Sequence, residues 1–417
     1  MIFERKQYLQ KLINGQGNGM VKIVTGIRRC GKSFLLFNIF RQYLLDHGTA
    51  EDHIISLSLD DRHNRSLTQP DALLACIDTH IAQDGKQYYV ILDEVQLVDD
   101  FVGVLLSLMH APNIEVYVSG SNSKFLSSDV VTEFRGRGWE IRVHPLSFAE
   151  YYAVAGGDKQ EALHEYYTYG GLPQVYAMTT PAEKEQYLKN LYETTYLRDI
   201  MERNHLQNED GMRRLVQVLS SDIGASTNPR RIANTFLSEE KVAIKDTTIR
   251  KYIDYLQNAF IISEALRYDV KGRKYIGTET KYYFEDMGLR NAVLNFRQVE
   301  FNHIMENVIY NELRMRGYSV DVGAVHTFAK DRNGKTVRKN LEVDFVVNRG
   351  SERVYIQSAY MLPDQEKTIQ EQRPLLYLPD NFRKVIIVGD RYLSNYNEDG
   401  IQLVGLFDFL LKTDDMF

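Results

Sequence analysis

Eight consecutive residues near the start of the chain have the types and the spacing of a loop that binds phosphate groups. Residues 26–33 read Gly-Ile-Arg-Arg-Cys-Gly-Lys-Ser and fit the pattern G-x-x-x-x-G-K-[ST]. In such a loop the backbone N–H groups face a β-phosphate, the lysine places its charge beside the β- and γ-phosphates, and the hydroxyl binds Mg²⁺. The pattern predicts that ATP and Mg²⁺ are bound here by Gly26, Ile27, Arg28, Arg29, Cys30, Gly31, Lys32, Ser33 and Phe34, with Lys32 acting on the phosphates and Ser33 as a metal ligand.

The segments on either side of this loop are those that a phosphate-binding loop requires. Residues 21–25 are mostly β-branched and predict a short strand, and residues 34–45 are mostly apolar and predict a helix. The positive end of such a helix adds to the attraction for phosphate. A Gly-Lys-Ser turn that arose by chance would lack this context.

A second segment supplies the acids that ATP hydrolysis needs. Residues 88–94 form an apolar run that ends in Asp93 and Glu94. We assign Asp93 to the Mg²⁺ site, because it lies nearest the strand tip, and Glu94 to activation of the attacking water. The alternative is a strand that ends in a solvated acidic turn.

Two further segments offer polar groups to a γ-phosphate. Residues 114–118 predict a third strand, followed by a Ser/Gly-rich turn in which either Asn122 or Ser121 is the candidate for sensing the phosphate. Residues 133–138 hold two arginines in a loop before a strand at 139–143. Arg137, or less favourably Arg135, is the candidate for a finger that reaches the γ-phosphate of a neighbouring subunit, and a salt-bridged surface arginine is the alternative.

These motifs together resemble a known family. The loop, the Asp93-Glu94 strand, the turn at 119–123, Gly136-Arg137 and the segments 145–151, 169–173, 284–291 and 342–346 are similar to the bacterial and archaeal AAA-type predicted ATPases. In that family an ATPase domain is joined to a C-terminal domain of unknown function. The resemblance spans nearly the whole chain and implies an AAA-type ATPase, but it implies no substrate.

Composition is that of an ordinary multidomain protein. The chain has 417 residues, of which 44% are hydrophobic and 25% charged, and its 50 basic and 56 acidic residues leave a net charge of −6. A mildly acidic chain does not coat nucleic acid, although a local basic face remains compatible with it. Two cysteines, Cys30 and Cys76, do not form a disulfide framework. With no apolar run of ~18 residues and no export segment, we expect a cytoplasmic protein.

The order of the motifs predicts an α/β fold in several parts. We expect a leading helix and Gly-rich link (1–20), a P-loop AAA-type core with a parallel sheet (21–150), a helical lid (151–205), a winged-helix-like domain (206–290) and an α+β domain (291–417). Exposed basic residues of the winged-helix region are candidates for contacting DNA phosphates, although such domains also serve as protein-contact modules. These candidates are Arg230, Arg231, Arg250, Lys251, Lys271, Arg273 and Lys274.

The last domain resembles the core of restriction-type nucleases. Glu306 and Glu312 lie in a predicted helix and Asp344 in a predicted strand, but Gln357 and Ala359 stand where that core has a glutamate and a lysine on the next strand. Loss of these two groups predicts an inactive nuclease core. Taken together, the sequence predicts a Mg²⁺-dependent ATPase switch acting on DNA or a protein partner. The alternatives are an ATP-binding sensor with little turnover and an ATP-dependent nuclease.

Overall fold

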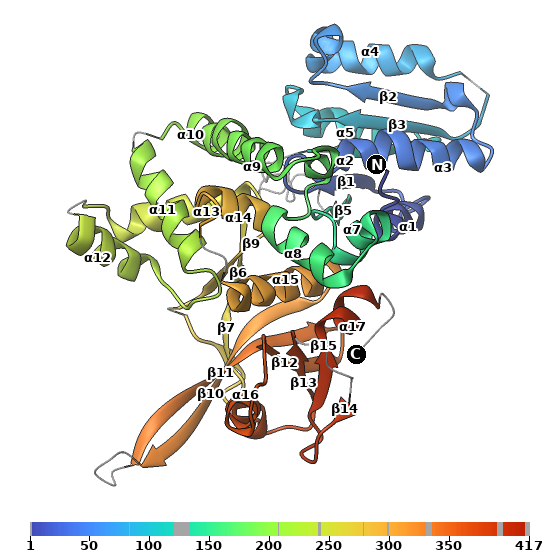
Figure 1. The fold of residues 1–417 in the computed structure, drawn as a ribbon. Helices are drawn as coiled ribbons and strands as arrows, with labels where there is room; N and C mark the ends of the chain where they lie inside the picture. Colours follow the sequence, from blue (N-terminus) through green and yellow to red (C-terminus); the bar gives the residue numbers. More distant parts are fainter. Residues whose placement is uncertain are drawn as a thin grey trace. The chain divides into compact units, whose positions relative to one another are not determined.

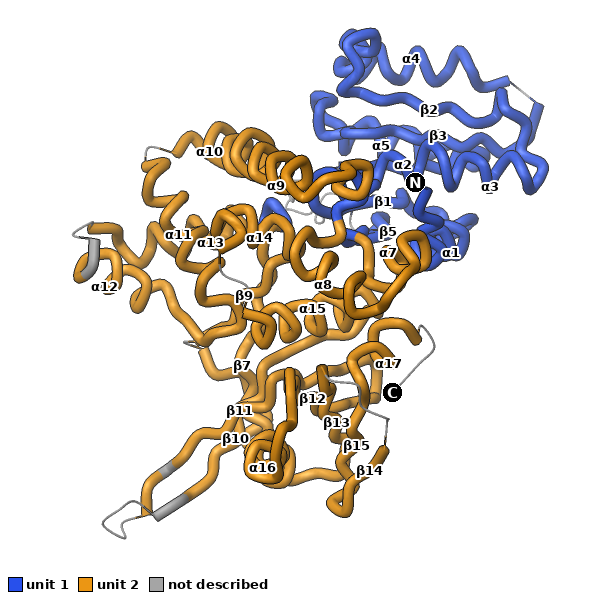
Figure 2. The backbone as a smooth tube through the Cα atoms, viewed as in Figure 1, with its two compact units in different colours: residues 1–145, 172–174, 258–260 blue, residues 146–171, 175–257, 261–417 orange. Residues whose placement is uncertain are grey.

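The computed structural model describes residues 2–82, 84–120, 134, 136–206, 208–240, 243–277, 279–297, 300–330, 336–389 and 395–412. They form two compact units, which are treated separately (Figure 2). Unit 1 holds residues 1–145 with the short segments 172–174 and 258–260, and unit 2 holds the remainder.

Unit 1 contains the segments that the sequence assigns to nucleotide binding (Figure 1). Its elements are α1 (Lys6–Asn14), β1 (Val21–Thr25), α2 (Lys32–Phe34), the π-helical turn η1 (Leu35–Phe40), α3 (Arg41–Asp46), η2 (Glu51–His53), β2 (Ile54–Ser58), η3 (Arg62–Thr68), α4 (Pro70–His80), β3 (Tyr88–Asp93), η4 (Val95–Leu97), α5 (Phe101–Met109), β4 (Ile114–Ser119) and β5 (Gly138–Arg142). The strands predicted at 21–25, 88–94, 114–118 and 139–143 are therefore present to within one residue at each end.

The five strands of unit 1 form one parallel sheet in the order β2-β3-β4-β1-β5. Successive side chains of a strand point to opposite faces, so each face has its own cover. On one face Val116 and Val118 pack in a core with Leu73 of α4 and Leu105 of α5. On the other face the ring of Tyr117 meets that of Phe40 in η1, with centroids 4.5 Å apart. Helices therefore cover both faces, as a doubly wound α/β sheet requires.

Unit 2 contains the segments assigned to the lid and to the C-terminal domains (Figure 1). The elements that lie wholly or mostly in it are α7 (Phe148–Ala155), α8 (Lys159–Tyr169), η6 (Pro173–Ala177), α9 (Pro181–Asn190), the π-helical η7 (Leu191–Leu197), α10 (Arg198–Arg203), α11 (Glu209–Ser221), α12 (Pro229–Glu240), α13 (Asp246–Asn258), β6 (Ile262–Ala265), β7 (Arg267–Asp269), β8 (Lys274–Tyr275), β9 (Lys281–Phe284), α14 (Met287–Val293), α15 (Phe301–Met315), β10 (Ser319–Lys330), β11 (Thr336–Arg349), β12 (Glu352–Ala359), α16 (Gln365–Leu376), β13 (Arg383–Val388), β14 (Asn395–Tyr396), β15 (Gln402–Gly405) and α17 (Leu406–Leu411). Among the residues described, no helix is both long enough and apolar enough to cross a bilayer.

The region predicted as a winged helix contributes strands to two sheets. The sequence predicts helices at 228–237 and 245–256 and a strand pair at 261–265 and 281–284. The structure has α12, α13 and the antiparallel pair β6–β9 in these places. The hairpin β7–β8 between them joins instead an eight-stranded sheet, in the order β14-β15-β13-β12-β11-β10-β7-β8. Residues 206–290 are thus continuous with the following sheet, and the winged-helix assignment and the boundary at residue 290 stay predictions.

A buried polar segment at the start of α14 organises the helical part of unit 2. The carboxylate of Asp286 caps α14 by accepting the N–H of Leu289 at 3.0 Å, and it also accepts the N–H of Gly171 at 2.7 Å. Arg290, which is fully buried, donates to the carbonyl oxygen of Ser220 in α11 at 2.8 Å. The amide of Asn291 donates to two carbonyl groups at the end of α8. Three neighbouring residues therefore hold α8, α11 and α14 together.

The pKa of Asp286 makes the stability of unit 2 depend on pH. Burial raises this pKa from 3.8 to about 6, against the opposing effect of the N–H groups that the carboxylate accepts. A raised pKa in the folded state means that the stability is fully present below about pH 4 and is lost as the pH rises through about 6. Between about pH 4 and about pH 7 we expect wild type to lose about 3 kcal/mol of unfolding free energy relative to Asp286→Asn, which keeps the shape of the neutral acid. Urea denaturation at several pH values measures this difference, and parallel pH profiles of the two proteins would contradict it.

Candidate nucleotide-binding site

The loop between β1 and α2 has a backbone that requires glycine at two positions. At Gly26 φ is +138°, and an added Cβ atom would lie 2.0 Å from the carbonyl oxygen of Val143. At Gly31 φ is +101°, again in the region that side chains disfavour. The thiol of Cys30 is buried and donates to the carbonyl oxygen of Val143 at 3.4 Å. The two glycines of the motif are thus required by the geometry of the loop itself.

The lysine and the serine of the loop begin the helix that follows it. The ammonium group of Lys32 is buried and donates to the carbonyl oxygens of Gly26 at 2.9 Å and Ile27 at 3.0 Å. It therefore lies inside the curve of the loop, where the charge of the lysine serves a phosphate group. Ser33 is exposed, and its hydroxyl lies near enough to the carboxylate of Asp93 to act against the rise in the pKa of that group. The two expected Mg²⁺ ligands are thus neighbours.

The tips of β3 and β4 meet at the same edge of the sheet as the loop. Asp93 and Ser119 are the last residues of their strands, and the neighbouring pair Leu92 and Val118 is in register. The hydroxyl of Ser119 donates to the Oδ1 atom of Asp93, and the N–H group of Glu94 donates to the same hydroxyl at 3.3 Å. Ser119 therefore joins both acids of the site.

The environment of Asp93 changes its affinity for protons. Burial raises the pKa of this carboxyl group above its usual value, and the hydrogen bonds from Ser119 and Ser33 and the charge of Lys32 offset only part of that increase. The negative charge of Glu94 adds to the increase. A carboxylate in this state gains more from a nearby cation than a solvated one does, which fits the role of a metal ligand.

Glu94 has an unusual backbone for a residue with a side chain. Its φ of 53° is in the left-handed region, which costs about 1 kcal/mol for a residue other than glycine. Its side chain is half-buried and accepts a hydrogen bond from the amide of Gln96. The strained turn is stabilised by the hydrogen bond from the Glu94 N–H group to Ser119.

Sequence reasoning missed the contribution of Ser119. The candidates Asn122 and Ser121 lie outside the residues that the structure describes, so their assignment stays a prediction. The alternation of side chains along β4 was the available signal. Val116 and Val118 form the apolar face of the strand, so Tyr117 and Ser119 must lie on the opposite face. That face is covered by the helix after the loop, and Asp93 lies on it too. A polar residue on that face at the last position of the strand marks the contact.

Only one of the two arginine candidates for the finger is among the residues that the structure describes. Arg135 lies outside the described residues. Arg137 is exposed, and its carbonyl oxygen accepts the N–H group of Val21 at 3.0 Å, at the edge of the sheet where β1 and β5 begin. The loop follows the other end of β1, about 16 Å away at about 3.3 Å per residue. Arg137 is therefore remote from the loop of its own chain.

The basic residues predicted to contact DNA are all exposed, but they belong to two parts of unit 2. Arg230 and Arg231 begin α12, and Arg250 and Lys251 lie on α13. The hairpin β7–β8 instead carries its basic turn to the eight-stranded sheet, where the ammonium of Lys271 donates to the carbonyl oxygen of His326 in β10 at 3.0 Å. The predicted face therefore comprises a helical part and a sheet part.

The acids of the last segment are placed on the elements that the sequence predicts. Glu306 is on α15 and Asp344 on β11, which pairs with β12. Gln357 is buried on β12, and its side-chain oxygen accepts the N–H group of Asp344 at 3.4 Å. Ala359 is part of an apolar core. Glu312 points elsewhere, because its carboxylate is paired with Arg316 at 2.7 Å.

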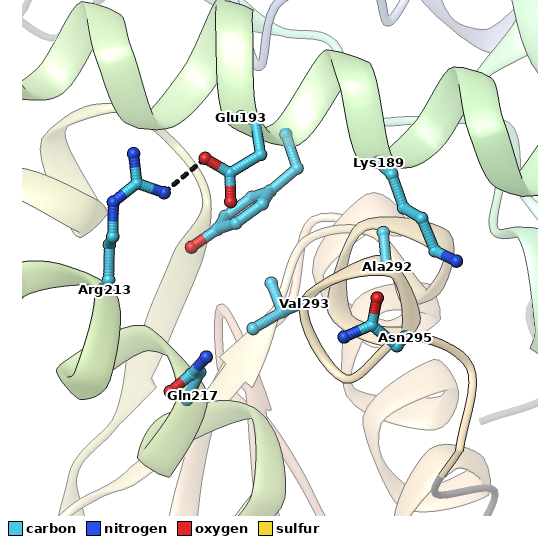
Figure 3. A pocket seen from close by; sticks show the side chains of 8 residues that line it. Lys189, Glu193, Arg213, Gln217, Ala292, Val293 and Asn295 are labelled. Atoms are coloured by element: carbon cyan, nitrogen blue, oxygen red, sulfur yellow. Dashed lines mark hydrogen bonds and ion pairs between the residues drawn. The ribbon is translucent and has the colours of Figure 1, made fainter.

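A cavity in unit 2 lies apart from all these residues. It has a volume of about 190 Å³ and is enclosed by side chains of η7, α11 and α14 and their neighbours (Figure 3). Glu193 and Arg213 form an ion pair at its edge. None of the residues singled out from the sequence lines it, and it is assigned no role. Its lining residues are Lys189, Tyr192, Glu193, Arg213, Gln217, Ala292, Val293 and Asn295.

Fold and site together define a P-loop nucleotide-binding protein with a parallel α/β sheet, followed by a C-terminal α/β region. Comparison with known proteins identifies the type. A family described as "AAA domain" matches residues 18–152, and a "Domain of unknown function (DUF8612)" matches residues 160–300. An uncharacterized protein of Haemophilus influenzae is 31% identical over 416 residues, which are 99% of each chain. The chain belongs to the bacterial and archaeal family of AAA-type predicted ATPases with a C-terminal domain of unknown function.

More distant similarities are of the same kind. An uncharacterized protein of Methanocaldococcus jannaschii is 26% identical over 362 residues, covering 83% of this chain and 76% of its own. The Orc1 protein of Aeropyrum pernix, solved with DNA, aligns with 70% of this chain and 92% of its own at 11% identity and a TM-score of 0.30. Cdc6p of Pyrobaculum aerophilum aligns with 73% and 94% at 13% identity and a TM-score of 0.31. Scores this low add nothing to the assignment, which rests on the family match.

Proposed function

We propose that this protein binds ATP with Mg²⁺, hydrolyses it, and uses the cycle as a switch on DNA or a protein partner. The observation that carries the proposal is the hydrogen bond from Ser119 to Asp93 beside the loop, where the enclosed ammonium of Lys32 and the hydroxyl of Ser33 both act to lower the pKa of Asp93. These are the positions at which a loop hydroxyl and a strand-end carboxylate would hold the Mg²⁺ ion of a bound nucleotide.

Each residue of the site has a role that follows from its position. Lys32, enclosed by the loop, neutralises phosphate charge, and Ser33 and Asp93 hold Mg²⁺, which when bound spreads the charge that develops on the phosphate oxygens. Glu94, one residue beyond the strand, orients water and accepts its proton. Ser119 is a positioning residue, because it fixes the carboxylate of Asp93 and the backbone of Glu94 at once.

A sensor that binds ATP and turns it over slowly is the second candidate. The observation that favours it is the hydrogen bond from Gln96 to the carboxylate of Glu94. The amide of Gln96 occupies a carboxylate oxygen of Glu94 that would otherwise be open to the attacking water. If this bond persists with ATP bound, removing the side chain of Gln96 should raise turnover.

Replacement of the proposed base separates binding from hydrolysis. In Glu94→Gln we expect the rate of phosphate release to fall by about a hundredfold or more, with ATP affinity retained, because the loop is unchanged. Lys32→Ala should lose affinity itself. Phosphate release and binding of a fluorescent ATP analogue measure the two effects.

The matched variant is Gln96→Ala, which alters the same carboxylate without removing it. Faster release in Gln96→Ala would support the slow sensor, and unchanged release would favour the ATPase. Full turnover in Glu94→Gln would contradict the assignment of Glu94.

Arg137 is proposed to act on the nucleotide of a second copy of the chain. Its place at the far edge of the sheet keeps it from its own loop, so the finger requires a neighbouring subunit. We expect Arg137→Ala to lower turnover by about a thousandfold, and mixing with Lys32→Ala to restore part of it, because mixed assemblies combine an intact loop with an intact arginine. Arg135→Ala tests the less favoured candidate in the same way, and failure of mixing to restore any activity would refute the action between subunits.

DNA is the proposed partner of the exposed basic residues on α12, α13 and the β7–β8 turn. The helices of residues 151–205 and 206–290 would then couple the nucleotide to DNA as a lid and a winged helix. In an electrophoretic shift assay at low salt we expect binding that weakens in Arg250→Ala and Lys251→Ala, each lowering the salt dependence by about 0.9 per lost phosphate contact. Lys159→Ala, at an exposed basic residue of α8, is the matched control. No shift at low salt would leave a protein partner as the target of the switch.

A further inference from the structure

A buried lysine lies among the acids of the C-terminal part of unit 2. The ammonium group of Lys281, on β9, is 2.8 Å from a carboxylate oxygen of Glu342, 2.9 Å from one of Glu306 and 3.9 Å from one of Asp344. Lys281 is only 4% exposed. The three acids come from α15 and β11, so one cation binds three elements of the unit together.

The same acids are those that a nuclease-like core would use for a metal ion. Glu306 and Asp344 are the two metal ligands that survive in the sequence, and their carboxylates face the ammonium. Oxygen atoms of these acids also accept hydrogen bonds from protein groups. Glu306 accepts the hydroxyl of Tyr283 at 2.7 Å, and Asp344 accepts the N–H group of Ser358 at 2.8 Å.

Little space remains beside Glu306. The backbone of Gly224 passes so close that an added Cβ atom would lie 3.1 Å from its carboxylate. Within the part of the chain that the structure describes, no three His, Cys, Asp or Glu side chains are spaced to share a metal ion. The carboxylates are therefore arranged around the ammonium rather than around a common metal position.

We infer that the ammonium group of Lys281 is a built-in cation that takes the place of a divalent metal ion, so that the nuclease-like core is a metal-free structural centre joining β9 to α15 and β11. Lys281 lies on β9 and not on the strand where such a core carries its lysine, since that position is Ala359 in the apolar core. Its charge holds together acids that would otherwise repel one another.

The pKa shifts in the cluster are consistent with an ammonium group in the place of a metal ion. Desolvation opposes the charged form of Lys281, but the carboxylates of Glu306, Asp344 and Glu342 outweigh it and raise the pKa of the ammonium above its usual value. Burial, with the charge of Glu306, raises the pKa of Asp344 well above its usual range.

The competing role for Lys281 is that of a water-activating group in a working nuclease. That role requires a metal ion beside the lysine, bound by the same carboxylates at about 2.1 Å. An ammonium that is 2.9 Å from a carboxylate oxygen of Glu306 and 3.9 Å from one of Asp344 repels a metal ion there. The two roles therefore predict opposite effects of removing the lysine.

The test is Mn²⁺ binding by the full chain without nucleotide, measured from the electron paramagnetic resonance of free Mn²⁺. Wild type and Asp344→Asn should bind the same amount of Mn²⁺. Comparing the two proteins removes the contribution of Mn²⁺ bound elsewhere on the chain. Lys281→Met, which keeps the length of the side chain without its charge, should gain a site at least about tenfold tighter than any that wild type shows there. The double variant Lys281→Met with Asp344→Asn should lose that site again.

Two further measurements make the outcome decisive. The melting temperature of Lys281→Met should rise with Mn²⁺ while that of wild type does not, because a cation that binds only the folded protein stabilises it. Supercoiled plasmid should stay intact with wild type, Mn²⁺ and ATP. Mn²⁺ binding by wild type that Asp344→Asn abolishes, or nicking by wild type that Asp344→Asn abolishes, would overturn the inference, and both can be scored even if Lys281→Met does not fold.

Discussion

The hydroxyl of Ser119 is the group on which the geometry of the nucleotide site depends. It donates to Asp93 and accepts from the backbone of Glu94, so it ties the two acids at the tip of β3 to the neighbouring strand β4. Because β4 also pairs with β1, which leads into the loop, the same hydroxyl fixes the acids relative to the phosphate-binding residues. A small polar residue at one strand end thus holds groups from three parallel strands together in one site.

Unit 2 is held by buried polar side chains that form hydrogen bonds with the backbone of other segments. Asp286 and Asn291 bond to N–H and C=O groups of other segments, and Arg290 reaches a carbonyl of α11. The side chain of Asn307 on α15 bonds in both directions with the backbone of Phe284 in β9, at 2.8 Å each. Such groups are expensive to bury without partners, so they specify one arrangement of helices and strands more sharply than apolar contacts do.

Prediction of the structure from the sequence was most accurate where a short local pattern determines the conformation. The glycines of the loop, the apolar strand before Asp93 and the periodic helices α12 and α13 are all readable locally, and all are present. The failures concern partners distant in sequence. Nothing near Ser119 indicates that β4 lies between β1 and β3, and nothing near Lys281 indicates that β9 lies beside Glu306. Such pairings can be deduced only when the order of the strands in the sheet is known. The periodicity of a single strand does not specify that order.

The chain contains two groups of acids that differ in how the protein itself satisfies them. At the nucleotide loop, Asp93 is paired with the neutral hydroxyls of Ser33 and Ser119, which can turn their lone pairs to an incoming metal ion without loss of charge balance. In unit 2 the acids around Lys281 already have a cation, and a metal ion would have to displace a buried ammonium. A carboxylate with neutral partners can still bind a metal ion, whereas a carboxylate paired with a cation must first lose that cation. By this reasoning we propose that the divalent ion binds at the loop of unit 1, and that the acids around Lys281 have a structural role.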